Sequence, residues 1–342
     1  MRKALGLLGL IAALSLLAFA IEMSRSGSST FFTLSNWKNL SPWIGLFGIL
    51  SLGQAIVIIT GGIDLSVGSV VALVSVTAAM LMDRGEGWDP LIVVPVCLGM
   101  CALIGLGNGL LITKMRLQPF IVTLCGLFIY RGITRFVAAD SSQGFGSYDG
   151  LRWLGKGTML DLFPALKAPA AEMGLFARIL SGMAAPFGCM LVLALLLTLY
   201  LHFSAQGRHL FALGANEEAA RFSGLRTGRL KLTAYVLCSV IAGFGGILFA
   251  FKINSIGPSD FGNFYELYAI AGAVLGGCSL RGGTGNILGV VLGISLLMVL
   301  RNIVNLLSIR SELEYVVIGG AILVGVCVDE LLMRRRAPAH AC

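Results

Sequence analysis

Long apolar segments, separated by short polar ones, follow one another along almost the whole chain. A helix needs about 20 mostly apolar residues to cross a bilayer. We expect ten such spans, at 4–21, 43–60, 64–82, 91–113, 119–138, 187–203, 231–251, 265–280, 286–307 and 315–332. Of the 342 residues, 57% are hydrophobic and 12% charged, whereas about a quarter of the residues in soluble domains are charged. The sequence therefore predicts an all-α, polytopic membrane helix bundle and excludes a cytoplasmic enzyme, a disordered protein and a secreted disulfide scaffold.

The charged residues are divided unevenly between the two sides of this bundle. With the N-terminus inside, the inner segments contain thirteen Lys and Arg against four Asp and Glu, and the outer segments contain ten against twelve. Cytoplasmic loops carry the excess of positive charge, so we expect a single membrane domain over 1–342 with both termini in the cytoplasm. Ala18-Phe19-Ala20 resembles a signal-peptide cleavage site, but we favour an uncleaved first span. No basic stripe with interleaved aromatic residues predicts nucleic-acid binding.

Catalytic and metal-binding patterns are missing from the sequence. The three histidines are scattered, and the eight cysteines form no Cys-x-x-Cys pair. Residues Gly150 to Lys156 have the glycine spacing of a P-loop, but Gly157 stands where a Ser or Thr must hold Mg²⁺. We therefore expect no enzyme activity, no cofactor and no metal.

The largest inner segment, 204–230, contains a short predicted helix. Asn216 is a good N-cap, and Glu217 and Glu218 follow in the first turn, where the helix dipole favours anions. Gly224 is placed as the residue just after the helix end. These signals predict a helix of about two turns near 217–223, which is either a passive surface helix or a docking element.

Asp64 is the most unusual single residue, because it lies between two apolar segments and has no other charged residue near it. An acid at membrane depth needs a partner or water. Gly61 and Gly62 break the helix before it, so Asp64 either caps the helix that follows or lines a path at a broken helix. A related Gly-Gly-x-x-Leu-x-x-Gly string begins at Gly276 and Gly277 and is a second candidate turn, or an internal repeat.

Several other polar residues fall in or near the predicted spans. The candidates for a translocation path, besides Asp64, are Asn108, Arg131, Glu266, Asn302 and Asn305. Tyr265 and Tyr268 are candidates for stacking beneath a sugar ring. Interhelical hydrogen bonding is at least as good an explanation for each polar side chain.

Five strings in order along the chain resemble one family. They are Gly61 to Ser69, Gln118 to Leu124 with Tyr130-Arg131-Gly132, the 207–224 loop with its Glu218-Ala219-Ala220-x-x-x-Gly224 pattern, Tyr265 to Ala271, and Gly276 to Gly283. Leu300-Arg301-Asn302 with Asn305-Leu306 also fits. Together they resemble the permease subunit of the ribose/simple-sugar class of bacterial ATP-binding-cassette importers. Tyr268, where that family usually has an acid, and the long outer segment 139–186 depart from the pattern and leave the substrate open.

The resemblance implies a non-catalytic subunit in a bacterial inner membrane. Its partners would be an ATPase subunit on the cytoplasmic side, a sugar-binding protein outside and a second permease chain. The residues that would couple to the ATPase are Gly214, Asn216, Glu217, Glu218, Ala219, Ala220 and Gly224. Ala219 and Ala220 would offer a small surface that can enter a groove. The alternatives are a branched-chain amino-acid or nucleoside permease of the same architecture, and a self-sufficient secondary transporter or channel.

Overall fold

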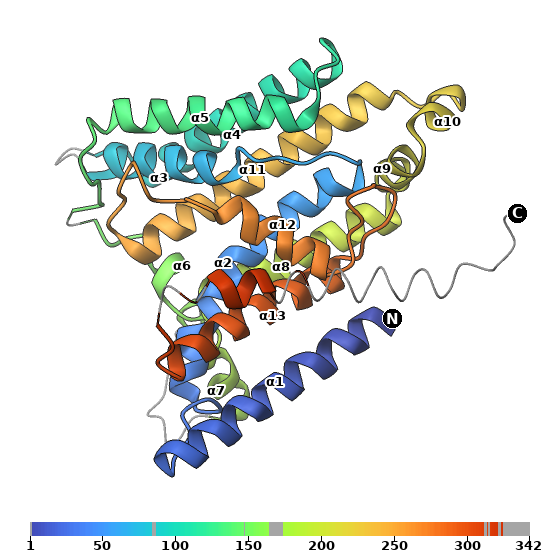
Figure 1. Cartoon of the computed structure of the whole chain (residues 1–342). Helices are drawn as coiled ribbons and strands as arrows, with labels where there is room; N and C mark the ends of the chain where they lie inside the picture. Colours follow the sequence, from blue (N-terminus) through green and yellow to red (C-terminus); the bar gives the residue numbers. More distant parts are fainter. Residues whose placement is uncertain are drawn as a thin grey trace, which may run out of the picture.

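The computed structural model describes residues 2–83, 87–146, 148–163, 174–310, 313, 315–320 and 323. Its named elements are all helices: α1 (Arg2–Ser26), α2 (Leu34–Ile59), α3 (Val67–Asp83), α4 (Pro90–Thr113), α5 (Pro119–Val137), α6 (Trp153–Lys156), the 3₁₀ helix η1 (Met159–Leu162), α7 (Leu175–Gly182), α8 (Ala185–Phe203), α9 (Ala205–Ala215), α10 (Glu217–Phe222), α11 (Thr227–Ile253), α12 (Tyr265–Leu275) and α13 (Ile287–Leu306). The expected all-α membrane bundle is confirmed as a class (Figure 1).

Helix α2 is the centre of the bundle. In its most hydrophobic stretch 94% of the residues are buried, and it packs against α8, α11, α12 and α13. Glycines on α2 allow this close approach: Gly48 faces Met190 of α8, and Gly53 lies against the Cys238 carbonyl of α11. Small residues let helix backbones pack closely where lipid supplies no hydrophobic force between helices.

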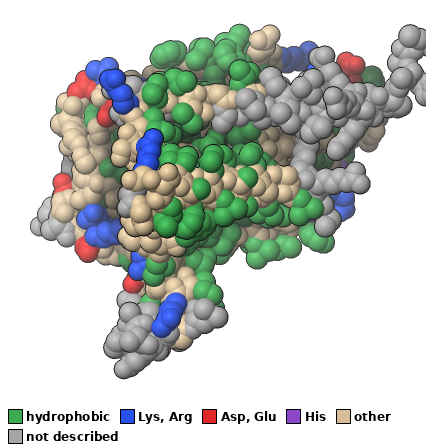
Figure 2. Space-filling view, turned by 60° about the horizontal axis from the view of Figure 1, so that its bottom comes forward, with side chains coloured by type: hydrophobic (Ala, Val, Ile, Leu, Met, Phe, Trp, Pro, Cys, Tyr) green, Lys and Arg blue, Asp and Glu red, His purple; other side chains and the backbone are tan. Residues whose placement is uncertain are grey.

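The outer helices present apolar side chains outward. Only 17% of the most hydrophobic stretch of α1 is buried, and 22% of those of α4 and α5. Leu5, Leu91, Leu103 and Phe128 are each more than 60% exposed. Figure 2 shows apolar side chains across the middle of one face and charged ones mainly toward its edges. Such a surface suits lipid or a second membrane subunit.

Seven helices of the described chain are long and apolar enough to cross a membrane: α1, α2, α4, α5, α8, α11 and α13. Helices α3 and α12 coincide with the expected spans 64–82 and 265–280 but are shorter. Most of the tenth expected span, 315–332, lies outside the described residues, as does the end of the chain. The count of ten spans and the inner position of the C-terminus therefore stay predictions.

The two ends of the bundle are formed by different elements. The N-terminus of α1 and helix α10 lie at the same end, on the right in Figure 1, while α6 and α7 lie toward the other end. We call these the inner and the outer end. At the outer end, Glu22 accepts hydrogen bonds from the backbone N–H groups of Thr30 and Phe31, both at 3.1 Å, and so fixes the turn between α1 and α2.

The described parts of the long outer segment are ordered by local contacts. Two antiparallel bridges join Gln143 to Ile256 and Thr158 to Ala184. The Lys156 ammonium donates a hydrogen bond to Asp149 and lowers the pKa of that carboxyl. Because both side chains are well exposed, this pair adds little stability.

Candidate coupling helix and translocation path

Helix α10 is capped at both ends by its own residues. The Asn216 Oδ1 accepts the backbone N–H of Ala219 at 2.9 Å. At the other end the N–H of Leu225 donates to the Ala220 carbonyl and that of Gly224 to the Arg221 carbonyl, with Gly224 at φ +84°. This is a Schellman cap, whose left-handed residue is usually glycine. The predicted short helix and both of its caps are confirmed, and the helix ends at Phe222 rather than 223.

The outward surface of α10 is larger and more apolar than expected. Glu218, Ala219, Arg221 and Phe222 are exposed, and the Phe222 ring is 84% exposed with the Arg221 guanidinium 5.8 Å from its centre. Ala220, which we expected on this surface, is 5% exposed and packs inward. An exposed aromatic beside an arginine is typical of an anchor in a protein interface.

Helix α10 is also tied sideways to the bundle. The Glu217 carboxylate accepts a hydrogen bond from the Lys231 ammonium of α11 at 2.6 Å. Asn216 ends α9 as well as starting α10, because its own N–H donates to the Ala212 carbonyl at 3.2 Å. No flexible linker therefore separates α9 from α10, so the two helices and the start of α11 can shift together.

Asp64 lies in a helix break inside the bundle. The chain is non-helical from the end of α2 to the start of α3, and Asp64 is fully buried. Its Oδ1 accepts the backbone N–H and the hydroxyl of Ser66, at 2.9 and 2.6 Å. Asp64 thus holds the turn that starts α3 at Val67, three residues beyond the expected start. Its Oδ2 has no hydrogen-bond partner among the described residues.

A chain of hydrogen bonds links this break to two neighbouring helices. The Tyr130 hydroxyl of α5 donates to the Asn108 Oδ1 of α4 at 2.8 Å, and the Asn108 Nδ2 donates to the Ser66 hydroxyl at 3.2 Å. Asp64, Ser66, Asn108 and Tyr130 therefore form one buried network. Irregular backbone at membrane depth is tolerated where protein groups satisfy it in this way.

Arg131 and Glu266 lie nearer the outer end. The Arg131 guanidinium donates to the carbonyls of Pro258 and Phe261, at 3.2 and 2.6 Å, and so anchors the loop before α12. Glu266 is 7% exposed in the first turn of α12. It packs against Gly68 of α3, where a β-carbon would overlap its carboxylate.

The two asparagines of α13 differ from each other. Asn302 and Asn36 of α2 exchange amide hydrogen bonds at 3.0 and 2.9 Å, so the Asn302 side chain joins two helices. Asn305 is exposed. The sequence alone gave no sign of Asn36 as the partner.

The two predicted glycine turns differ in their backbone conformation. Gly61 and Gly277 have φ of +80° and +96°, a conformation that glycine adopts without steric cost. Gly62 and Gly276 permit close approach, to the Tyr235 hydroxyl and the Gly289 backbone. In the first string the positive φ falls on the first glycine, Gly61, and in the second string it falls on the second glycine, Gly277. The shared sequence pattern therefore forms two different turns and not one repeated turn.

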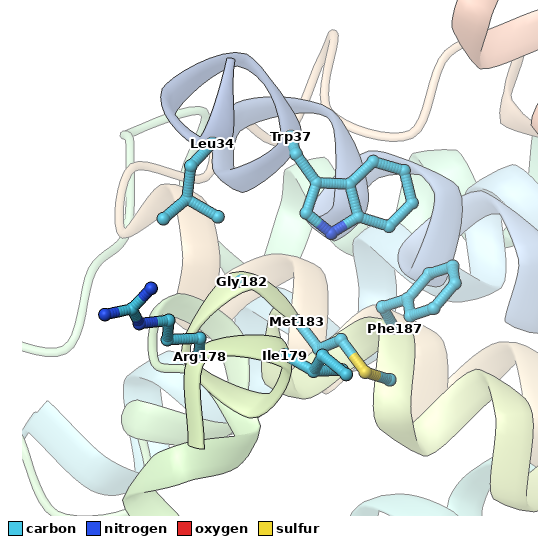
Figure 3. Close-up of a pocket in the computed structure, with 7 residues that line it drawn as sticks. All are labelled: Leu34, Trp37, Arg178, Ile179, Gly182, Met183 and Phe187. Carbon is cyan, nitrogen blue, oxygen red and sulfur yellow. The ribbon is translucent and has the colours of Figure 1, made fainter. Parts of the chain in front are cut away.

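A cavity of about 390 Å³ lies at the outer end between α2, α7 and α8. Figure 3 shows Leu34 and Trp37 on one side and Ile179, Met183 and Phe187 on the other. Arg178 of α7 is the one charged side chain of this otherwise apolar lining (Figure 3). Sugars need several amide, hydroxyl or carboxylate partners, so the lining does not suit one.

Comparison with known proteins identifies the family. The profile of a family described as "Branched-chain amino acid transport system / permease component" matches residues 36–326. This chain belongs to that family. The permease is 35% identical to the ribose import permease protein RbsC of Escherichia coli K12, over 94% of its own length and 92% of the relative's. It is 34% identical to the galactose/methyl galactoside import permease protein MglC of Escherichia coli K12, over 90% of both chains.

A third relative, the xylose transport system permease protein XylH of Escherichia coli K12, is 29% identical over 97% of the permease and 94% of the relative. No solved structure matches. The similarity to an import-permease family that the sequence strings indicated is therefore confirmed, and it extends over nearly the whole chain.

Proposed function

We propose that this chain is the transmembrane, non-catalytic permease subunit of an ATP-driven importer for a monosaccharide in a bacterial inner membrane. The observation that carries the proposal is the similarity to RbsC over 94% of the permease, at 35% identity. MglC and XylH are also sugar permeases by name. The family description names amino-acid transport, so a branched-chain amino-acid permease is the second candidate.

The proposed complex has an ATPase subunit at the inner end, a sugar-binding protein at the outer end and a second permease chain beside this one. Helix α10 supports the first contact, because its exposed Glu218, Ala219, Arg221 and Phe222 lie on a short, capped helix at the inner end. The exposed apolar faces of α4 and α5 are available for contact with a second membrane subunit.

The path residues are proposed in two groups. Glu266 and Asn305 are proposed to line the path, since neither side chain is held in a reciprocal pair like that of Asn302. Asp64, Asn108, Arg131 and Asn302 are proposed to fix the helices around it, because each is bonded to another segment or to the turn that starts α3. A self-sufficient secondary transporter would instead need several coupling acids along the path, and only Asp64 and Glu266 among these candidates are acids.

The test is uptake into proteoliposomes that contain the permease, its ATPase subunit and its binding protein. Radiolabelled ribose, galactose and xylose are compared with leucine, with and without ATP. ATP-dependent uptake of one sugar supports the proposal. Uptake of leucine alone would favour the amino-acid alternative, and sugar uptake that needs no ATP would contradict an ATP-driven importer.

A further inference from the structure

Three segments that lie far apart in the sequence meet at the inner end, backbone against backbone. They are the end of α2 (59–61), the end of α9 (214–215) and the turn between α12 and α13 (281–283), and we call them the inner joint. The Gly283 N–H donates to the Ile59 carbonyl at 2.9 Å. In Figure 1 the loop between α12 and α13 lies beside the end of α9.

The inner joint has no room for a side chain at Gly214 or at Gly282. A β-carbon at Gly214 would overlap the Ile59 carbonyl oxygen and lie 2.5 Å from the Gly283 nitrogen. One at Gly282 would lie 2.7 Å from the Gly214 oxygen and 2.9 Å from the Gly61 nitrogen. Because the atoms in the way are backbone atoms, they cannot turn aside as a flexible side chain could.

The inner joint is continuous with α10. Ala215 is the last residue of α9, and its α-carbon would lie 2.7 Å from a β-carbon at Gly283. The next residue, Asn216, closes α9 and caps α10. A displacement of α10 therefore reaches the joint without passing through a flexible segment.

The inner joint also leads to the candidate path. Ile59 ends α2, the central helix, and the break that holds Asp64 follows directly. The turn at 281–283 follows α12, whose first turn carries Glu266 against Gly68. Packed interfaces of this kind move as rigid bodies rather than deforming continuously.

We propose that Gly214, Gly282 and Gly283 are positioning residues for transport, because they let the inner joint carry the displacement of α10 to α2 and to the turn between α12 and α13. This inference rests on the proposed function, in which the ATPase subunit moves α10. It adds the route by which that movement enters the bundle.

The first test is Gly214→Ala with Gly228→Ala as the matched control. Gly228 is also at the inner end, at the start of α11. A β-carbon added there would have the Thr113 Cβ as its nearest neighbour, at 3.8 Å, which is an ordinary contact distance. We expect Gly214→Ala to insert and to co-purify with the ATPase subunit. We expect it to lose most of the hydrolysis stimulated by the loaded binding protein and to cut uptake at least ~10-fold, the size of typical coupling energies.

Normal uptake by Gly214→Ala, or equal loss in Gly228→Ala, would overturn the proposal. Failure of the wild-type chain to bind an ATPase subunit would instead contradict the proposed function. The experiment therefore distinguishes failure of the proposed function from failure of this inference.

A second test does not depend on that substitution folding well. In a background without native cysteines, Ala215→Cys and Gly283→Cys place β-carbons about 3.0 Å apart, close enough for a disulfide after a small shift. Because Gly283→Cys itself adds a β-carbon to the joint, the reduced double variant is expected to keep only part of wild-type uptake, and the oxidised form is compared with that reduced form. If the inner joint moves as one body, oxidation leaves this remaining uptake unchanged. Uptake that is abolished by oxidation and restored by reductant would show that the segments separate, and would contradict the proposal.

Discussion

At the scale of single residues, Phe222 is the strongest candidate for an anchor on the ATPase subunit. Its ring is 84% exposed at the inner end, and buried aromatic anchors contribute about 2 kcal/mol or more to an interface. We expect Phe222→Ala to weaken binding of the purified ATPase subunit about 30-fold. The matched control is Phe136→Ala on α5, which is 87% exposed away from the inner end. Equal binding by wild type and Phe222→Ala would rule out the anchor.

Asp64 is expected to act as a hydrogen-bond acceptor rather than as a charge. Asparagine retains an oxygen that can accept both bonds from Ser66, whereas alanine leaves two buried donors unpaired at a cost of about 1–3 kcal/mol each. We expect Asp64→Asn to keep more than half of wild-type uptake and Asp64→Ala to lower the melting temperature and the yield. Loss of uptake in a well-folded Asp64→Asn protein would show that the negative charge is required.

The Asn36–Asn302 pair is expected to be structural. Removing either asparagine takes a hydrogen-bond partner from the other, and Asn36→Ala also removes the bond that the Asn36 Nδ2 donates to the Phe31 carbonyl at 2.9 Å. We therefore expect Asn36→Ala and Asn302→Ala each to lower thermal stability in detergent, and the double variant to be about as stable as the less stable single one. Strictly additive losses would mean that the two amides do not interact.

Residue roles could be predicted from the sequence where the partners are local. Asn216 and Gly224 cap a helix of six residues, so their partners lie within that short segment. The partner of Asn302 is 266 positions away, and the glycines of the inner joint meet backbone from two other segments. Neither spacing nor composition encodes such contacts.

At the scale of elements, α10 must keep its shape to work. Gly224 has φ +84°, whereas proline fixes φ near −65°. We expect Gly224→Pro to insert normally but to abolish uptake, because the Schellman cap cannot form. Glu218→Lys is expected to do the same by reversing a charge on the exposed surface. Wild-type uptake by well-expressed Gly224→Pro would refute the coupling role of α10.

The sidedness of two elements can be measured directly. Ser223 beside α10 is exposed at the inner end, and Ser142 is exposed in the outer segment. In cells that carry single cysteines on a cysteine-free background, an impermeant maleimide is expected to label Ser142→Cys from outside. Ser223→Cys should react only after the membrane is opened, and labelling of intact cells at position 223 would overturn the topology.

The sequence predicted which segments form helices better than it predicted where those helices begin and end. Helix α2 begins at Leu34 rather than 43, because Asn36 and Lys38 interrupt the apolar run while Thr33 caps the helix. Helices α3 and α12 are shorter than the expected spans because irregular turns replace helix at 60–66 and after Leu275. Hydropathy detects segments that avoid water, whether they face lipid or protein, and it cannot separate helix from buried turn.

At the scale of the whole molecule, the chain is expected to be one subunit of a complex. The apolar outer helices, the exposed α10 and the similarity to sugar import permeases are best explained together by partners in the membrane and at the inner end. The central place of α2 could not be predicted from its hydropathy, because α1 and α4 are more hydrophobic and yet only 17% and 22% of their most hydrophobic stretches are buried.

The ATP-driven importer can be tested by mild detergent purification of the tagged chain from its own cells, with crosslinking and mass spectrometry of the co-purifying proteins. We expect a stoichiometric subunit with a P-loop ATPase sequence, which crosslinks to the exposed face of α10. A homo-oligomer without such a subunit, reproduced under crosslinking, would contradict an ATP-driven importer and favour a self-sufficient transporter or channel.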